Sequence, residues 1–99
     1  MAAYMIVFAR IRDRARFLAE YARPTAELVA RMGGEYVLRA PGVQALEGGL
    51  FEGASTVISR WPNRAALDAF YHSAEYAALR EARGPLAEAY VLVAEDPPA

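Results

Sequence analysis

Residues 3–11 are the feature that most limits how this chain can fold. The segment is rich in β-branched and aromatic residues, which predicts a strand. Alternate residues of a strand point to opposite faces, and here both alternating sets are apolar. The two sets are Tyr4, Ile6 and Phe8, and Met5, Val7, Ala9 and Ile11. Such a strand is typical of a sheet that is covered on both faces.

A broken helix is expected after this strand. Asp13 stands where an N-cap belongs, since its carboxylate can accept from the free amides of the next turn. Residues 14–32 then carry apolar side chains at helical spacing. Pro24 lacks a backbone donor and crowds the preceding turn, so we expect a kink or break near it. Gly33 and Gly34 end the helix, with Gly33 in the left-handed position.

The second half of the chain predicts more strands and a second helical layer. The segments with strand patterns are residues 35–39, 43–47, 54–61 and 86–94. Asn63 caps a helix whose apolar stripe follows the spacing i, i+3, i+4, i+7. The stripe consists of Leu67, Phe70, Tyr71 and Ala74. Ser73 caps a further helix over residues 74–83.

The order of elements is therefore strand, helix, a strand in two pieces, strand, helix, strand. This order predicts an α+β, ferredoxin-like sandwich, with one antiparallel sheet and its helices on one face. A length of 99 residues predicts a single domain over 1–99. Hydrophobic residues make up 56% of the chain, and a single small core cannot easily bury that many apolar side chains. We expect a second copy to cover the free sheet face, which gives a homodimeric α+β barrel with a mostly filled interior.

The segment over residues 61–76 carries the most specific pattern. It reads Trp-Pro-Asn-Arg-Ala-Ala-Leu-Asp-Ala-Phe-Tyr-His-Ser-Ala-Glu-Tyr. This resembles the signature of the family called domain of unknown function 1330 (DUF1330), and Pro24 and Gly33-Gly34 agree with that pattern. The resemblance implies a dimeric α+β barrel. It implies no reaction, because the wider superfamily includes cofactor-free monooxygenases, haem-degrading enzymes and isomerases.

The chain departs from the family pattern at three places. His72 stands where Asn is common, and Ala74 replaces a usual Pro. Residues 49–51, Gly-Leu-Phe, occur where the family often has Asp-Trp. A family site that used these positions would be altered here.

Composition argues against several classes of function. The net charge of −1 leaves no basic excess for a phosphate backbone, so we expect no nucleic-acid partner. All 11 cationic side chains are Arg, which excludes Schiff-base chemistry on Lys. There is no Cys, and one His without an acidic cluster predicts no metal and no cofactor. The apolar N-terminal run lacks a basic region before it, and no apolar run is long enough for a bilayer, so we expect a cytoplasmic protein with no membrane partner.

Two residues are candidates for catalytic proton transfer. His72 is the only side chain with an ordinary pKa near neutrality. Glu47 lies near a turn, and a position beside a barrel interior would raise its pKa. Both have simpler interpretations: His72 as an exposed partner of Asp68, and Glu47 as a partner of Arg39 or of solvent.

Three residues are candidates for ligand binding. Arg39 can hold a carboxylate or enolate in a bidentate fork. Trp61 and Tyr71, together with Tyr36 and Tyr76, can line an aromatic pocket. Aromatic residues at strand ends and on a helical stripe equally suit a core or a dimer interface.

These residues support three functions. The first is a homodimer that binds a small apolar or aromatic/keto molecule in a barrel pocket. The second is a cofactor-independent oxygenase or isomerase, in which Glu47 or His72 moves a proton and Arg39 stabilises negative charge. The third is a ligand-free structural dimer, which the presence of a cavity would argue against.

Overall fold

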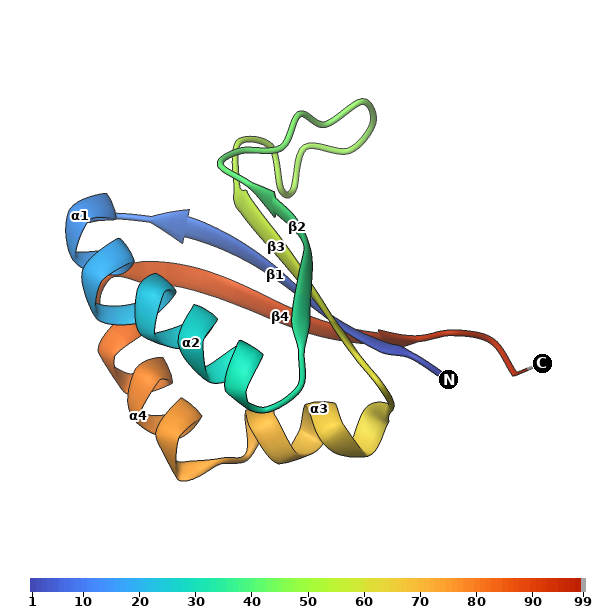
Figure 1. Cartoon of the computed structure of the whole chain (residues 1–99). Coiled ribbons are helices and arrows are strands. Elements are labelled where there is room, and N and C mark those ends of the chain that lie inside the picture. Colours follow the sequence, from blue (N-terminus) through green and yellow to red (C-terminus); the bar gives the residue numbers. More distant parts are fainter. Residues whose placement is uncertain (99) are drawn as a thin grey trace.

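A computed structural model describes residues 1–98 and contains four strands and a helical layer (Figure 1). The strands are β1 (Ala3–Ile11), β2 (Glu35–Ala40), β3 (Ser55–Trp61) and β4 (Ala87–Glu95). The helical elements are α1 (Arg14–Phe17), a π-helical turn η1 (Leu18–Ala22), α2 (Arg23–Arg31), α3 (Arg64–Tyr71) and α4 (Ala74–Arg83). None of the helices within residues 1–98 has the length and apolar character needed to cross a membrane.

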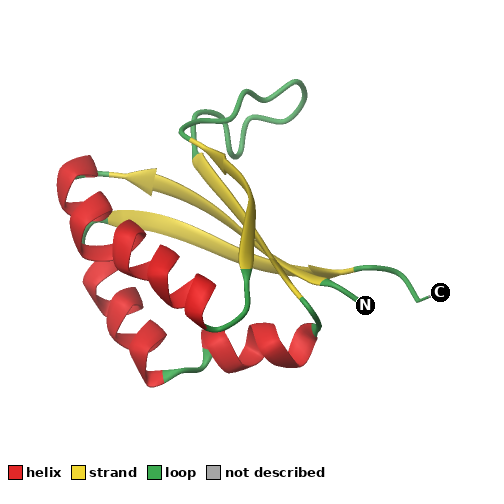
Figure 2. Cartoon of the chain, viewed as in Figure 1, coloured by secondary structure: helices red, strands yellow, loops and turns green. Residues whose placement is uncertain are grey.

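The four strands form one antiparallel sheet in the order β2-β3-β1-β4. The helices all lie on one face of it (Figure 2). Val7 in the centre of β1 is opposite Val57 of β3 and Val91 of β4. This confirms the predicted α+β, ferredoxin-like fold.

The first helical segment changes to a π-helical turn just before Pro24, close to where the sequence predicts a kink or break. The Asp13 carboxylate accepts from the Arg16 amide at 3.1 Å and starts α1. At η1 the helix widens, and the Arg23 amide donates to the Leu18 carbonyl five residues earlier. Pro24 then takes a place at the start of α2, where its missing donor is least costly. Gly33 ends the segment with a φ of 96°.

The second helical layer begins at the predicted caps. The Asn63 side chain accepts from the Ala66 amide at 2.8 Å, and the Ser73 hydroxyl accepts from the Tyr76 amide at 3.1 Å. Leu67 and Phe70 are buried, as predicted. The expectation for Ala74 is wrong, because α3 ends at Tyr71 and α4 starts in a new direction that leaves Ala74 exposed.

The predicted strand over residues 43–47 is also wrong. Residues 41–54 form a loop between β2 and β3, shown at the top of Figure 1. Two backbone hydrogen bonds join the two ends of this loop: the Val43 amide donates to the Ala54 carbonyl at 3.0 Å, and the Gly53 amide donates to the Val43 carbonyl at 2.8 Å. Gly48 and Gly53 adopt left-handed backbone angles that curl the chain away from a strand. Leu46, at 92% exposed, has no core to pack against.

The main core lies between the sheet and the helices. Its largest fully buried side chains are Trp61, Tyr76, Phe70, Leu28 and Leu67. The Trp61 ring packs against Phe70 at 4.9 Å between centroids, and its indole N–H donates to the Ser59 hydroxyl at 3.0 Å. Trp61 therefore belongs to the core.

The outer face of the sheet is only partly covered in the single chain. Tyr4, Ile6 and Phe8 are half-buried there, whereas the opposite set of β1 is packed under the helices. Phe51, from the loop over residues 41–54, stacks on Phe8 at 3.9 Å between centroids. Leu38 and Leu92 remain 43% and 46% exposed. Burial of both faces of β1 is thus incomplete within one chain.

Candidate functional site

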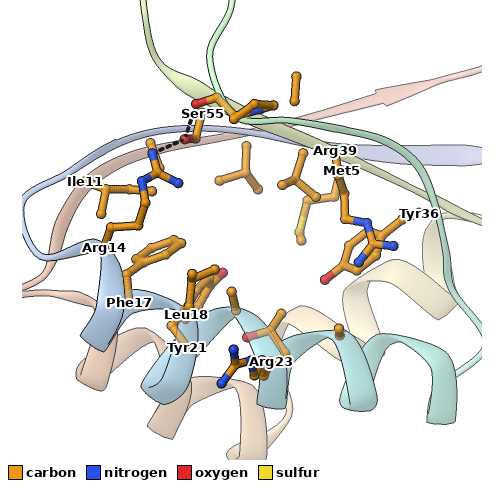
Figure 3. Close-up of a pocket in the computed structure, with 18 residues that line it drawn as sticks. Met5, Ile11, Arg14, Phe17, Leu18, Tyr21, Arg23, Tyr36, Arg39 and Ser55 are labelled. Carbon is orange, nitrogen blue, oxygen red and sulfur yellow. Dashed lines mark hydrogen bonds between the residues drawn. The ribbon is translucent and has the colours of Figure 1, made fainter.

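A cavity of about 310 Å³ lies between the sheet and the segment that runs from α1 through η1 to α2 (Figure 3). Its walls come from the helix-facing sides of β1, β2 and β3 and from that helical segment. The volume corresponds to roughly ten water molecules at about 30 Å³ each, within the range of small-ligand pockets. The sequence predicts that any cavity lies inside a barrel formed by two copies, which is on the opposite face of the sheet from this cavity.

The cavity has an apolar floor and a cationic mouth. Buried lining residues mark the floor, and they are Met5, Val7, Ala9, Phe17, Tyr21 and Thr25. Exposed lining residues mark the mouth, and they are Arg14, Leu18, Arg23, Arg39 and Pro41. A ligand can therefore bury an apolar body while one end stays near water.

Helical spacing explains the helix side of the mouth. Residues 14, 18, 22 and 26 all line the cavity, and a separation of four places side chains along one face of a helix. The stretch is continuous across η1, so Arg14 and Leu18 stand in line with Ala22 and Ala26. The sequence contains this spacing, but its apolar members also fit an ordinary core stripe.

A strand irregularity explains the sheet side of the mouth. Tyr36 pairs with Ser59 and Arg39 with Val57, so both face the helices. They are three positions apart in the sequence, which in a regular strand would put them on opposite faces. A register shift between Tyr36 and Leu38 absorbs the extra residue. This bulge brings the phenol and the guanidinium to the same cavity.

Contacts with neighbouring side chains hold two of the mouth arginines, one on each side of the cavity. The Arg39 guanidinium carbon lies 5.0 Å from the centroid of the Tyr36 ring. Arg14 donates to the Ser55 hydroxyl at 3.3 Å, and that hydroxyl donates to the Pro41 carbonyl at 2.8 Å. Figure 3 shows the Arg14 and Arg39 side chains on opposite sides of the cavity.

Tyr36 supplies a protonated hydroxyl at the cavity. Burial raises the pKa of its phenol to about 12, with nearby Tyr21 adding to the shift and Arg39 opposing it. The phenol therefore keeps its proton at neutral pH and can donate to a carbonyl or carboxylate oxygen.

A second phenol cluster braces the cavity wall. The Tyr21 and Tyr76 hydroxyls are 2.7 Å apart, and Arg83 donates to them at 3.1 and 3.2 Å. Burial raises the pKa of Tyr76 further than that of Tyr36. Because these groups satisfy one another, we assign them a structural role in holding η1 against α4.

Thr25 is a polar exception in the floor. It is 4% exposed, and its hydroxyl has no hydrogen-bond partner among residues 1–98. Buried polar groups normally have partners, since an unmade hydrogen bond costs about 1–3 kcal/mol.

A wider hollow of about 670 Å³ lies beside Gly33, Gly34 and Trp61. Most of its lining is exposed, and its Arg60 is already within 3.7 Å of the Glu35 carboxylate. Groups of three or more acidic, His or Cys side chains that could hold a metal do not occur within residues 1–98. The cavity beneath the helices is the better candidate site.

The structure separates the residues that the sequence suggested for a site. Arg39 lines the cavity. Trp61 lies in the core at 1% exposed, and Tyr71 is half-buried beneath Arg80, whose guanidinium carbon is 4.6 Å from the ring centroid. Glu47 is exposed in the loop over residues 41–54, and His72 is exposed at the end of α3. Neither of the last two lines the cavity.

The model of the family described as "Domain of unknown function (DUF1330)" matches residues 2–97. The chain belongs to the DUF1330 family. The resemblance drawn from residues 61–76 is thereby confirmed. The search of curated proteins gave no match for this DUF1330 chain.

Solved structures similar to this DUF1330 chain share its fold at low identity. RPA0582, a protein of unknown function from Rhodopseudomonas palustris, has a TM-score of 0.75 at 18% identity, covering 99% of this chain and 84% of that chain. SnoaB, a cofactor-independent oxygenase from Streptomyces nogalater, has a TM-score of 0.70 at 15% identity, with coverage of 99% and 95%. A dimeric protein of unknown function from Bacteroides fragilis, with a ferredoxin-like fold, scores 0.56 at 14% identity, with coverage of 96% of each chain.

Proposed function

We propose that this DUF1330 protein binds a small aromatic or keto compound in the cavity between its sheet and helices. The observation that carries the proposal is an apolar cavity of about 310 Å³ with Tyr36 and Arg39 at its edge. Apolar walls favour a flat hydrophobic body, and a few polar groups at one end fix its orientation. No bound cofactor is needed for this role.

Native mass spectrometry of the freshly purified protein tests the proposal. We expect a retained small molecule, which denaturation releases for identification. Ala22→Phe fills the cavity from η1 and should abolish retention. Ala30→Phe adds the same bulk at an exposed position of α2 outside the cavity, and should retain the ligand. Equal retention by both variants would place the ligand elsewhere.

The protein acts as a homodimer in this proposal, paired through the outer face of the sheet. Support comes from the apolar side chains left accessible there, including Leu38, Tyr90 and Leu92. The dimeric Bacteroides fragilis protein has a similar fold. Light scattering should give twice the chain mass of 10.8 kDa. A stable monomer at micromolar concentration would contradict the dimer.

A second candidate is a cofactor-independent oxygenase or isomerase, favoured by the fold shared with SnoaB. Its first step would remove a proton next to a substrate carbonyl. The Tyr36 hydroxyl would donate to the carbonyl oxygen while Arg39 stabilises the developing enolate. Glu47 or His72, the bases predicted from the sequence, could accept the proton only after the segment carrying it moves to the cavity.

Variants at these residues test the enzyme candidate once a turnover is found. Tyr36→Phe should lower kcat, because it removes the donor and keeps the ring. Glu47→Gln or His72→Gln should abolish turnover if that residue is the base. Full activity in both would remove both residues from the mechanism, and a cavity that retains a compound unchanged would favour binding alone.

A further inference from the structure

We infer that the ligand of this cavity is an organic anion, with an apolar body against the floor and a carboxylate at the cationic mouth, paired with Arg39. This inference rests on the proposed binding function and specifies the chemical class of the ligand. The inference depends on the positive charge of the arginines at the mouth, with which a neutral aromatic or keto compound would form no ion pair.

The charge of the cavity wall favours an anionic ligand. The 18 lining residues include three arginines, Arg14, Arg23 and Arg39, and no Asp or Glu. The ion pairs described within residues 1–98 are Arg16–Glu20, Arg31–Glu75, Arg60–Glu35, Arg64–Asp68 and Arg64–Glu95. None of them includes a mouth arginine. In a chain with a net charge of −1, three of the arginines outside these ion pairs therefore line the same apolar cavity, with no acidic side chain beside them in its wall.

Two guanidinium groups at the mouth are held in position by neighbouring side chains. Arg39 rests on the Tyr36 ring, and Arg14 is tied to Ser55, so each side chain has lost part of its conformational freedom before a ligand arrives. A guanidinium presents a planar fork of donors that matches the two oxygens of a carboxylate. The protonated Tyr36 hydroxyl adds a neutral donor beside Arg39.

The charge of such a ligand would lie at the mouth of the cavity and not on its floor. An ion buried among Met5, Val7 and Phe17 would lose its hydration without compensation. The mouth is formed by exposed residues, so a carboxylate there keeps contact with water while it pairs with arginine. A small inorganic anion would leave the apolar floor unfilled. An amphipathic acid satisfies both regions.

A matched pair of probes tests the inference: 2-naphthoate and its neutral analogue 2-naphthamide, titrated into the protein by calorimetry. Both carry the same ring, so the difference between them reports the charge. We expect the acid to bind at least about 10-fold more tightly, as contacts to charged groups usually contribute that much. Added salt should weaken binding of the acid and leave binding of the amide unchanged, since salt screens the interaction between charges.

Arginine variants locate the charge contact. Arg39→Gln should weaken binding of the acid by roughly 10-fold without changing binding of the amide. Arg14→Gln removes a charge from the opposite side of the mouth and should weaken binding of the acid less. Arg12→Gln is the control: it removes one positive charge from an exposed position that does not line the cavity, and should bind both probes as wild type does.

The outcomes separate the two proposals. Equal binding of acid and amide, unaffected by Arg39→Gln, would overturn the anion inference and leave the binding function intact. Failure of both probes to bind the wild-type protein would overturn the binding function and the inference with it. A loss of acid binding in Arg12→Gln equal to that in Arg39→Gln would show a general charge effect, and would overturn the assignment to the mouth.

Discussion

Gly34→Ala should strongly destabilise the protein, because Gly34 lies directly against the ring of Trp61. A Cβ built at residue 34 would be 2.6, 2.7 and 2.8 Å from Cζ2, Cε2 and Cη2 of that ring. Carbon atoms in favourable contact are about 3.5–4.0 Å apart. The new methyl group therefore forces a displacement of roughly 1 Å.

Trp61 has little room to move away. It is 1% exposed, it packs on Phe70, and its indole N–H is bonded to the Ser59 hydroxyl. Overpacking of this kind costs about 1–3 kcal/mol, and we expect the upper end because three atoms of a rigid ring are involved. At about 4–8 °C per kcal/mol for a domain of this size, Tm should fall by roughly 12–24 °C.

Urea denaturation followed by tryptophan fluorescence measures the change, since Trp61 is the only Trp. Gly49→Ala is the matched control: a Cβ there meets nothing within 4 Å, so its stability should stay within about 1 kcal/mol of wild type. An unchanged midpoint for Gly34→Ala would refute the packing around Trp61, and with it the assignment of Trp61 to the core.

Three smaller changes test other parts of the structure. Asn63→Ala should cost about 1 kcal/mol in urea unfolding, because it removes the cap of α3; an unchanged midpoint counts against the cap. Thr25→Val should leave stability equal or higher, since the buried hydroxyl has no partner among residues 1–98; a loss above about 1 kcal/mol would show that the hydroxyl is hydrogen-bonded in solution. Tyr36 has its pKa raised by burial from 10.0 to about 12, so the unfolded chain ionises first and stability falls as pH rises between those values. Tyr36→Phe should reduce this alkaline loss, and parallel curves for variant and wild type would be inconsistent with a buried phenol.

Local chemistry made much of the fold predictable. Asp13, Asn63 and Ser73 cap the helices that they precede, because a cap needs only neighbouring amides. A π-helical turn precedes Pro24, because proline lacks a backbone donor and disturbs the regular helix around it. The predicted strand at residues 43–47 is wrong because such a short segment looks alike in a loop and in a strand, and pairing with another strand decides the outcome.

The candidate site was much less predictable. Arg39 was identified by chemistry, but its arrival beside Tyr36 depends on a bulge that only strand pairing reveals. Met5, Val7 and Phe17 look the same in sequence whether they fill a core or line a cavity. Arg14 and Ser55 are 41 residues apart and meet only through the fold. Glu47 and His72 stand out by residue type, which carries no information about distance from a cavity.

Calorimetric titration of 2-naphthoate into wild type, Ala22→Phe and Ala30→Phe tests whether the cavity beneath the helices binds a ligand. If the cavity beneath the helices is the binding site, wild type and Ala30→Phe should bind the probe, and Ala22→Phe should not. Circular dichroism of the three proteins should be the same, since one alanine is half-buried at the cavity and the other is exposed. Binding by folded Ala22→Phe with the affinity of wild type would show that the probe binds outside this cavity.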